Sequence, residues 1–334
     1  METREPRNSL KYISSQTEAI LLLTTYFYKP SNNSLKPLTI KEWGRLAQWL
    51  KDHNLNPENL VNGRLKSSLN GWTDKSITVE RIEQLINRGS ALALAMEKWT
   101  RAGLWVLTRS DKDYPNRLKQ LLKTDCPPVL FGCGDPALLN NGGIAVVGAR
   151  NANDDDLGFS RKLGGKAANQ GYSIISGGAR GVDEAAMLAA LEAEGTVIGV
   201  LADSLLKAAT SKKYRNYLIN QNLVLVSPYY PEAGFNAGNA MSRNKYIYCL
   251  SDTSVVVKSD TKGGTWNGAL ENLKEQWVPL WVKISTDINS GNTQLIRKGG
   301  KPLPEDLSQL DIEMLAAPKD NLTSSAQDLF KQLP

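Results

Sequence analysis

Two short apolar segments, each followed by a loop that carries glycine and arginine, constrain the fold of this chain more than any other feature. The segments are Ile144–Val147 and Tyr172–Ile175, which contain β-branched residues and do not alternate between polar and apolar positions. This pattern predicts strands that are buried on both faces of a parallel sheet. The second loop leads into Val182–Glu194, which is alanine-rich, has acids in its first turn and ends before Gly195, as a helix does.

The glycine-rich loops between strand and helix predict a site for an anion. Such a loop places bare backbone N–H groups at the positive end of the helix dipole, and Arg150 and Arg180 add positive charge beside them. Because parallel strands end at one edge of a sheet, both loops are expected where open α/β folds bind ligands. Glycines in such loops also serve as plain tight-turn residues, but the two loops together favour phosphate or nucleotide binding.

From Ile144 onward, short apolar segments alternate with segments of helical spacing. The further strands are expected at Thr196–Leu201, Leu223–Val226, Ser254–Val257 and Val278–Val282, and the further helices at Leu157–Gln170, Ser211–Asn220, Ser242–Leu250 and Thr265–Gln276. This alternation predicts an α/β fold with a doubly wound, mostly parallel sheet and right-handed crossovers. From Gly291 the chain is expected to be irregular, with a last short helix at Ser324–Leu333.

The first hundred residues predict a small helical domain. Thr39 is an expected N-cap for Ile40–Leu50, which carries Trp43 and Leu46 on one face, as a helix of the core does. The other helical segments are Ser15–Tyr28, Pro57–Val61, Ser76–Asn87 and Ser90–Ala102. After Gly103 the segments Leu104–Leu107 and Val129–Phe131 are strand-like. We therefore expect a helical N-terminal domain (1–100), a sheet domain (101–310) and a C-terminal tail (311–334).

Two further segments place cations or glycines at expected helix starts. Ser242–Lys245 opens a helix with two cations in its first turn, where they oppose the dipole. A bound anion would remove this conflict, although a solvated pair of charges is the alternative. Lys262–Thr265 is a third strand–glycine–helix junction, in which Thr265 is placed to cap the helix or to bond a phosphate oxygen. Four loops are thus expected to supply anion donors to one edge of the sheet.

The composition excludes several classes of function. The single histidine, His53, lies in a polar stretch outside the glycine loops, so the sheet domain cannot build a Ser-His-Asp triad, a Cys-His dyad or a histidine zinc site. No GxGxxG follows the first strand and no GxxxxGK[ST] occurs, which argues against a standard NAD-binding site and an ATPase. We expect no cofactor and no metal.

Charge and cysteine content indicate a cytoplasmic protein with an acidic partner. A net charge of +6 and a pI near 9.0 favour nucleic acid, but 34 acids accompany the 40 bases, so any basic surface must be local. The three cysteines form no CxxC pair, as in a reduced protein. The longest early apolar run, Ala19–Phe27, is too short to span a bilayer, and no signal peptide is expected before it.

Four motifs, in this order, resemble the DprA/Smf family of DNA-processing proteins. They are VVGARN (Val146–Asn151), SGGARGVDEAAM (Ser176–Met187), SRNKYIYCLSD (Ser242–Asp252) and KGGTWNGALEN (Lys262–Asn272). The resemblance extends outward through LTRSDKDYPNRLKQL and PPVLFGCGD on one side and GNTQLIRKGG on the other. It therefore covers residues 101–310 with several ordered motifs, which is more specific than any single loop.

The resemblance implies an extended Rossmann-like fold, a homodimer, and binding of single-stranded DNA with delivery of the recombinase RecA to it, without catalysis. The DNA contacts that it implies come from Gly148, Arg150, Ser176, Gly177, Arg180, Gly181, Arg243, Asn244 and Lys245. The loop analysis adds as phosphate-binding candidates Gly178, Ser242, Lys262, Gly263, Gly264 and Thr265. Backbone amides and arginines hold phosphates without reading the base sequence.

The chain departs from the family's pattern at several positions. Met187 stands where the family usually has histidine, Lys258 takes a usually acidic position, and Gly263–Thr265 replaces a Ser-Gly-Ser loop. The run after Ser227 (PYYPEAGFNAGNAM) is unlike the usual Ser-Glu-Tyr-Pro text, and no C-terminal winged helix is expected. These departures indicate a divergent branch. A mobile-element or phage-defence module with another protein partner is therefore an alternative to RecA loading in natural transformation.

Two other functions are open. SGGARG and GGT also resemble the LOG-type phosphoribohydrolases, whose catalytic glutamate lies within a turn of the glycine-threonine motif. Here Glu271 lies six residues beyond Thr265, nearly two helical turns away, so nucleotide binding without turnover, as in a sensor, is the more favoured form of this alternative. The other possibility is a regulatory, antitoxin-like subunit that restrains a partner protein and releases it when nucleic acid or a nucleotide appears.

Overall fold

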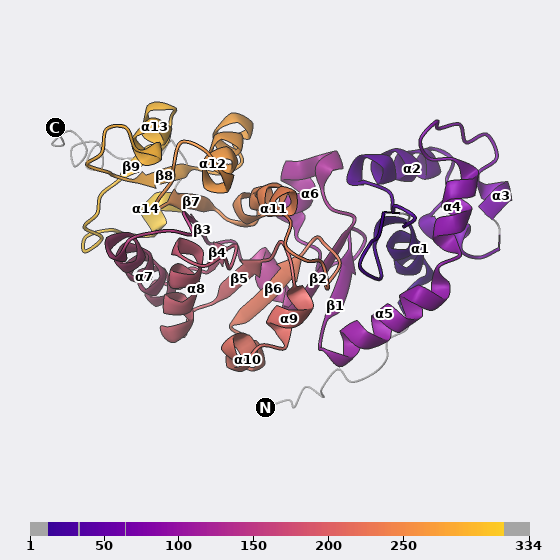
Figure 1. Ribbon diagram of the computed structural model, residues 1–334, viewed down its shortest axis with the longest axis horizontal. Helices are drawn as coiled ribbons and strands as arrows, with labels where there is room; N and C mark the ends of the chain where they lie inside the picture. Colours follow the sequence, from indigo (N-terminus) through magenta and orange to yellow (C-terminus); the bar gives the residue numbers. More distant parts are fainter. Residues whose placement is uncertain (1–12, 33, 64, 317–334) are drawn as a thin grey trace.

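A nine-stranded sheet runs through the larger part of the molecule in the computed structural model, which describes residues 13–32, 34–63 and 65–316 (Figure 1). Its order is β1-β2-β6-β5-β4-β3-β7-β8-β9. The strands are β1 (Trp105–Thr108), β2 (Val129–Gly134), β3 (Ile144–Val147), β4 (Ile174–Ser176), β5 (Val197–Val200), β6 (Leu223–Ser227), β7 (Thr253–Val256), β8 (Leu280–Lys283) and β9 (Lys301–Leu303).

The central part of this sheet is parallel, and the chain winds outward from β3 in both directions. Strands β6, β5, β4, β3, β7, β8 and β9 pair in parallel, whereas β2 pairs antiparallel with β6 and β1 antiparallel with β2. After β6 the chain crosses back to place β7 beside β3. The predicted fold class, a doubly wound and mostly parallel α/β sheet, is confirmed.

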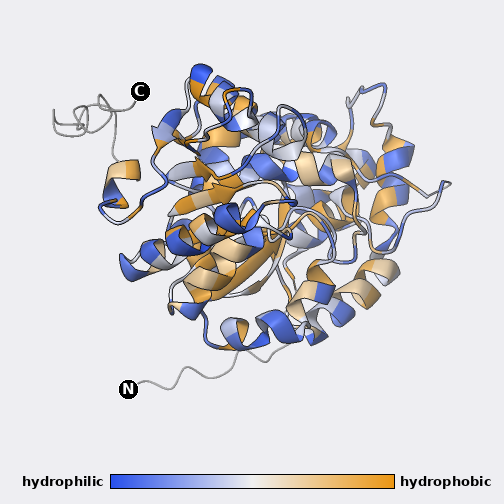
Figure 2. Ribbon diagram, turned by 60° about the vertical axis from the view of Figure 1, so that its left-hand side comes forward, coloured by the Kyte–Doolittle hydropathy of each residue, from blue (hydrophilic) through white to orange (hydrophobic). Residues whose placement is uncertain are grey.

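Helices cover both faces of the sheet, because adjacent strand residues point to opposite sides. The cluster on one face contains Ile144 and Val146 of β3, and the cluster on the other contains Ala145 and Val147. The first face is covered by α7 (Asp154–Asn169), α8 (Val182–Glu192), α9 (Leu205–Ala209) and α10 (Lys212–Ile219). The second is covered by α6 (Asn116–Leu122), α11 (Ala237–Leu250), α12 (Gly264–Glu275) and α13 (Gly291–Arg297). Figure 2 shows mostly hydrophobic strands between helices in which hydrophilic and hydrophobic residues are mixed.

The N-terminal helices gather at one end of the molecule, beside β1 and β2 (Figure 1). Their apolar core is continuous with that of the sheet. The fully buried Trp99 packs edge-on against Phe131 of β2, with ring centres 5.2 Å apart, and against Phe27 at 6.4 Å. These helices are α1 (Ser15–Thr24), α2 (Ile40–Asp52), α3 (Leu65–Ser68), α4 (Val79–Ile86) and α5 (Gly89–Arg101). The remaining helical turns are the 3₁₀ turns Pro57–Leu60, Lys123–Asp125 and Pro136–Asn140, and α14 (Glu313–Ala316).

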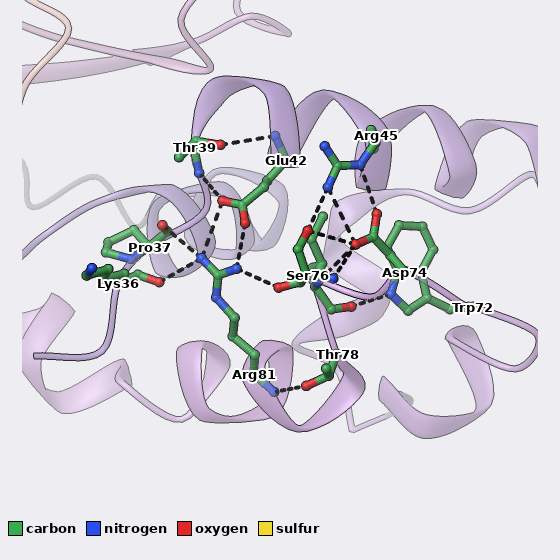
Figure 3. A network of polar contacts seen from close by, with 11 residues as sticks. Lys36, Pro37, Thr39, Glu42, Arg45, Trp72, Asp74, Ser76, Thr78 and Arg81 are labelled. Carbon is green, nitrogen blue, oxygen red and sulfur yellow. Dashed lines mark hydrogen bonds and ion pairs between the residues drawn. The ribbon is translucent and has the colours of Figure 1, made fainter.

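A polar network joins the start of α2 to the loop before α4 (Figure 3). Thr39 and Glu42 form the capping box of α2, in which the side chain of each accepts the backbone N–H of the other. Arg81 donates to the Glu42 carboxylate at 2.7 Å, and Arg45 donates to the Asp74 carboxylate at 2.8 Å. The predicted cap at Thr39 is thus confirmed, and its acidic partner also fixes α4.

Several helix starts differ from the sequence expectation, and two of them lie at the predicted anion-binding segments. Helix α11 begins at Ala237, five residues before Ser242, because the Asn236 side chain accepts the N–H of Asn239 and caps it there. The expectation that Ser242–Lys245 forms a first turn was therefore wrong. Helix α12 begins at Gly264 after Gly263, whose φ of 97° turns the chain sharply, so Thr265 is not its N-cap.

The chain after Gly291 is more regular than its sequence predicts. Helix α13 and strand β9 both lie there. Helix α13 starts with glycine and asparagine, which are weak helix formers, but it is anchored by Asn292. The Asn292 amide donates to the carbonyls of Val257 and Lys283 and accepts the N–H of Ser259. The helix expected at Ser324–Leu333 lies outside the described residues. Within the described ranges, no helix is long and apolar enough to cross a membrane.

We expect opposite results from alanine at two adjacent glycines of α7. A Cβ atom at Gly164 would lie 2.3 Å from the carbonyl oxygen of Ala186 in α8, so Gly164→Ala must push the two helices apart and destabilise the protein by about 1–3 kcal/mol. A Cβ atom at Gly165 meets nothing within 4 Å, so Gly165→Ala should stabilise the helix by about 1 kcal/mol. Urea unfolding measures both, and equal effects would contradict the packing of α7 on α8.

Asp74 should make the stability depend on pH in the acid range. The hydrogen bond from Arg45 holds the pKa of this carboxyl well below its usual value. Because its pKa is lower in the folded state, the ionised carboxyl stabilises the folded protein at pH values above the unfolded pKa of about 4. This contribution to the free energy of unfolding is lost as the pH falls through the folded pKa. Asp74→Asn should therefore destabilise at neutral pH and have progressively less effect in acid, measured by urea midpoints. The exposed Asp52→Asn serves as control, and an Asp74→Asn effect independent of pH would contradict this.

Candidate nucleic-acid interface

Loops that follow the parallel strands enclose two adjoining hollows at the carboxyl edge of the sheet. The first, the switch-point hollow of about 510 Å³, lies between the loops after β3 and β7, where the strand order reverses. The second, the glycine-loop hollow of about 700 Å³, lies between the loops after β4 and β5. Both are lined by Arg150, Ala179, Phe235 and Arg243, so they are neighbours. Open α/β sheets bind ligands at this edge.

Arg243 lies between the two hollows and is almost completely buried. Its side chain is 5% exposed, and within the described residues Nε and Nη1 have no hydrogen-bond partner. The guanidinium packs directly on Gly177, where a Cβ atom would come 1.5 Å from Nη1. A buried cation with unsatisfied donors is costly unless a ligand or a charge compensates it. An anion in either hollow would supply compensating charge.

Asp183 provides the negative charge nearest to this cation. It lies in the first turn of α8 and is buried, and its carboxylate accepts the backbone N–H groups of Gly148 at 3.3 Å and Gly177 at 3.1 Å. Burial raises the pKa of Asp183, while the charge of Arg243 and these two N–H groups act against the increase. The amides of Gly148 and Gly177, which were expected to bind phosphate, are therefore engaged by Asp183.

The first turn of α12 forms the opposite wall of the switch-point hollow. Lys262, Gly263, Gly264 and Thr265 all line it, and Lys262 is exposed. Asn244 donates its amide to the Gly264 carbonyl at 3.0 Å, which fixes α11 against the start of α12. The positive end of the α12 dipole thus faces the same hollow as Arg243.

Exposed side chains complete the lining of the two hollows. The guanidinium of Arg150 lies 4.9 Å from the ring centre of Phe235, an aromatic side chain that is 61% exposed. Arg180 is exposed and lines the glycine-loop hollow. The two linings together contain six cationic and three acidic side chains, so the surface has a net positive charge that suits a polyanion.

The structure does not bring every predicted residue to these hollows. Ser176 is fully buried, and its hydroxyl donates to the carbonyl of Val146 at 2.6 Å. Gly181 has a φ of 100° and lies against the Ala149 carbonyl, where a Cβ atom would come within 2.6 Å. Ser242 and Lys245 line a third hollow, on the side of the N-terminal helices. The predicted residues that line the two edge hollows are Gly148, Arg150, Gly177, Gly178, Arg180, Arg243, Asn244, Lys262, Gly263, Gly264 and Thr265.

Sequence reasoning missed the parts of Phe235 and Asp183 in this surface. Phe235 stands alone in a run of glycine, alanine and asparagine, where an exposed aromatic residue is unusual and could have been noticed. Asp183 was interpreted as an ordinary acid in a first helical turn. Its contact with the loops after β3 and β4 depends on residues 35 and 6 positions away, and no local pattern predicts such a contact.

The comparisons with known proteins agree with this architecture. The sequence profile of the family described as DNA recombination-mediator protein A matches residues 105–312. The chain is 25% identical to DNA processing protein DprA of Bacillus subtilis over 308 residues, which cover 91% of this chain and 92% of that protein. Its fold is similar to that of DprA from Streptococcus pneumoniae, with a TM-score of 0.64 at 20% identity over 82% of this chain and 99% of that one.

A second solved structure concerns nucleic-acid binding. It is DNA processing protein A from Helicobacter pylori, which is described as having a unique single-stranded DNA binding mode. The similarity has a TM-score of 0.51 at 25% identity and covers 69% of this chain and 97% of that one.

Asp183→Asn should strongly destabilise the folded protein at the carboxyl edge of the sheet. The amide would leave one of the two backbone N–H groups unpaired and remove the negative charge near Arg243, so we expect a loss of about 3 kcal/mol or more in the free energy of unfolding. Glu184→Gln is the matched control. Glu184 is the next residue of α8 and pairs with Lys213 at the surface, where such pairs contribute about 1 kcal/mol at most. Equal losses in both variants would contradict the role given to Asp183.

Proposed function

The chain belongs to the DNA recombination-mediator protein A family of DNA-processing proteins, and from this premise we propose that it is a non-enzymatic adaptor that binds single-stranded DNA at the carboxyl edge of its sheet. The observation that carries the proposal is the buried guanidinium of Arg243, whose Nε and Nη1 have no partner among the described residues and which lies between two positively charged hollows. A phosphate group in either hollow offers the negative charge that this buried guanidinium needs.

The form of the surface supports binding without sequence readout. Arginines and the first turn of a helix contact phosphates, which are alike in every nucleotide. Phe235 offers an exposed ring on which a base can stack, and every base has such a face. The hollows are open and adjoining, as a strand that passes across the edge requires.

The position of Glu271 supports a binding role over glycoside cleavage. It is the glutamate nearest in sequence to the glycine-threonine motif, but it is exposed on α12 and is not among the lining residues of either edge hollow. A phosphoribohydrolase needs a carboxylate within reach of the bond that it cleaves. A free nucleotide would meet the same cations as DNA, so competition between the two is part of the test.

We also propose a homodimer and a protein partner, either RecA or a component of a mobile-element or defence module. Both expectations derive from the family resemblance. The unusual run after Ser227 is a departure that fits a changed partner.

The test is fluorescence anisotropy of a labelled oligothymidylate, titrated with salt. We expect binding that falls as salt rises, and a salt slope that decreases by roughly 0.7 for each phosphate that a variant no longer binds. Arg243→Ala should weaken binding at least about tenfold, since hydrogen bonds to charged groups contribute about 1.5–3 kcal/mol. Arg150→Ala and Arg180→Ala, which alter exposed side chains, should each lower the slope without unfolding the protein. Arg161→Ala, on the exposed surface of α7, is the control.

The outcomes separate the candidates. No binding at low salt by the folded protein would contradict the DNA proposal. Complete displacement of the strand by a nucleoside monophosphate at similar concentration would favour the small-nucleotide sensor. Release of free base from a nucleoside monophosphate, abolished in Glu271→Gln, would favour the enzyme.

A further inference from the structure

We propose that a bound single strand continues from the carboxyl edge into the groove between the N-terminal helices and the sheet, so that these helices form the second part of the binding surface. The inference rests on the proposed function, since it extends the path of the same ligand. The groove is the third hollow, of about 840 Å³, and we call it the interdomain groove. Residues from the end of α1 to the start of α2 line one wall, the segment after β6 and α11 line the other, and residues between Asp125 and Phe131 line the groove as well.

The interdomain groove and the edge hollows meet at one side chain. Phe235 lines all three hollows, and its ring is more than half exposed. Ser242 and Lys245 of α11 line the groove, whereas Arg243 and Asn244 of the same helix line the switch-point hollow. One helix therefore presents polar side chains to both places, and a strand that leaves the edge past Phe235 enters the groove directly.

A bridging segment, Pro228–Asn236, holds the two parts together. On the N-terminal side, the rings of Tyr26 and Tyr230 lie 6.1 Å apart and Lys98 of α5 pairs with Glu232. On the sheet side, the carbonyls of Pro231 and Ala233 accept backbone N–H groups from the start of α9 at 2.9 and 2.7 Å. The segment is thus fixed from both directions, and Phe235 near its end has a defined position. This segment is the first part of the run Pro228–Met241 that departs from the pattern of the resembling family.

The chemistry of the groove fits single-stranded nucleic acid. Three lysines line it, Lys29, Lys41 and Lys245, against a single acid, Asp125. Lys29 and Lys41 are exposed. The aromatic residues Tyr26, Tyr229 and Tyr230 are partly exposed in the same lining. Lysines that follow a backbone, together with aromatic rings on which bases stack, are the two components of sequence-tolerant single-strand sites.

The experiment compares two strand lengths and two pairs of lysines. A short oligothymidylate of about four nucleotides should occupy only the carboxyl edge, and one of about twenty should reach the groove. The groove variant is Lys29→Gln with Lys41→Gln. The control is Lys51→Gln with Lys66→Gln, exposed lysines of the N-terminal helices that do not line the groove. All four substitutions are at the surface, so the variants should fold, which circular dichroism and thermal unfolding verify.

We expect the groove variant to bind the long strand about 25-fold more weakly near 0.1 M salt, with a salt slope smaller by about 1.4, because two phosphates of the strand would no longer be neutralised. Its binding of the short strand should equal that of the parent. The control should match the parent with both strands, and Arg243→Ala should weaken both.

Equal binding of the long strand by the groove variant and the control would overturn the inference while leaving the proposed function intact. Loss of the short strand in the groove variant would also overturn it, because the groove would then belong to the edge site itself. If the parent binds neither strand, the proposed function fails, and the inference fails with it.

Discussion

The burial of the Arg243 guanidinium is the constraint on which the carboxyl edge of this protein depends. A cation that is removed from water needs compensation. The charge of Asp183, whose carboxylate is itself held by the amides of Gly148 and Gly177, supplies part of it, while Nε and Nη1 of Arg243 have no hydrogen-bond partner among the described residues. Gly177 also leaves the space in which the guanidinium lies. Asp183 thus ties the start of α8 to the loops after β3 and β4 through two hydrogen bonds. Arg243 of α11 packs on the second of these loops at Gly177.

This arrangement gives the glycine loops a different role from the one expected. They would ordinarily offer their backbone N–H groups to a ligand, but two of these groups are engaged by Asp183. The loops after β3 and β4 therefore act mainly as a frame for Arg243, and the first turn of α12 is the backbone element that faces the switch-point hollow from the other side. Because β7 lies beside β3, the sheet order alone brings α12 to this position.

The N-terminal helices pack on the sheet and adjoin the edge hollows. Trp99 joins their apolar core to β2, and the bridging segment joins their surface to the edge hollows. A ligand bound at the edge therefore lies next to a second wall of different chemistry, in which lysines and tyrosines replace arginines and glycines.

The sequence by itself determined the fold class and the loops that meet at the sheet edge, because buried strands and their spacing are local patterns. It predicted β3 with the bounds that the structure has, and it identified most of the residues that line the edge hollows. It missed α13 and β9, since Asn292 acts through hydrogen bonds to other segments that propensity does not reveal. It placed the start of α11 too late, although Asn236 is a residue type that commonly caps a helix. Only the tertiary structure decided that Arg243 is buried on Gly177, that Asp183 engages the loop amides and that Phe235 joins three hollows. Each of these depends on contacts between segments distant in the chain, and such contacts leave no local signal.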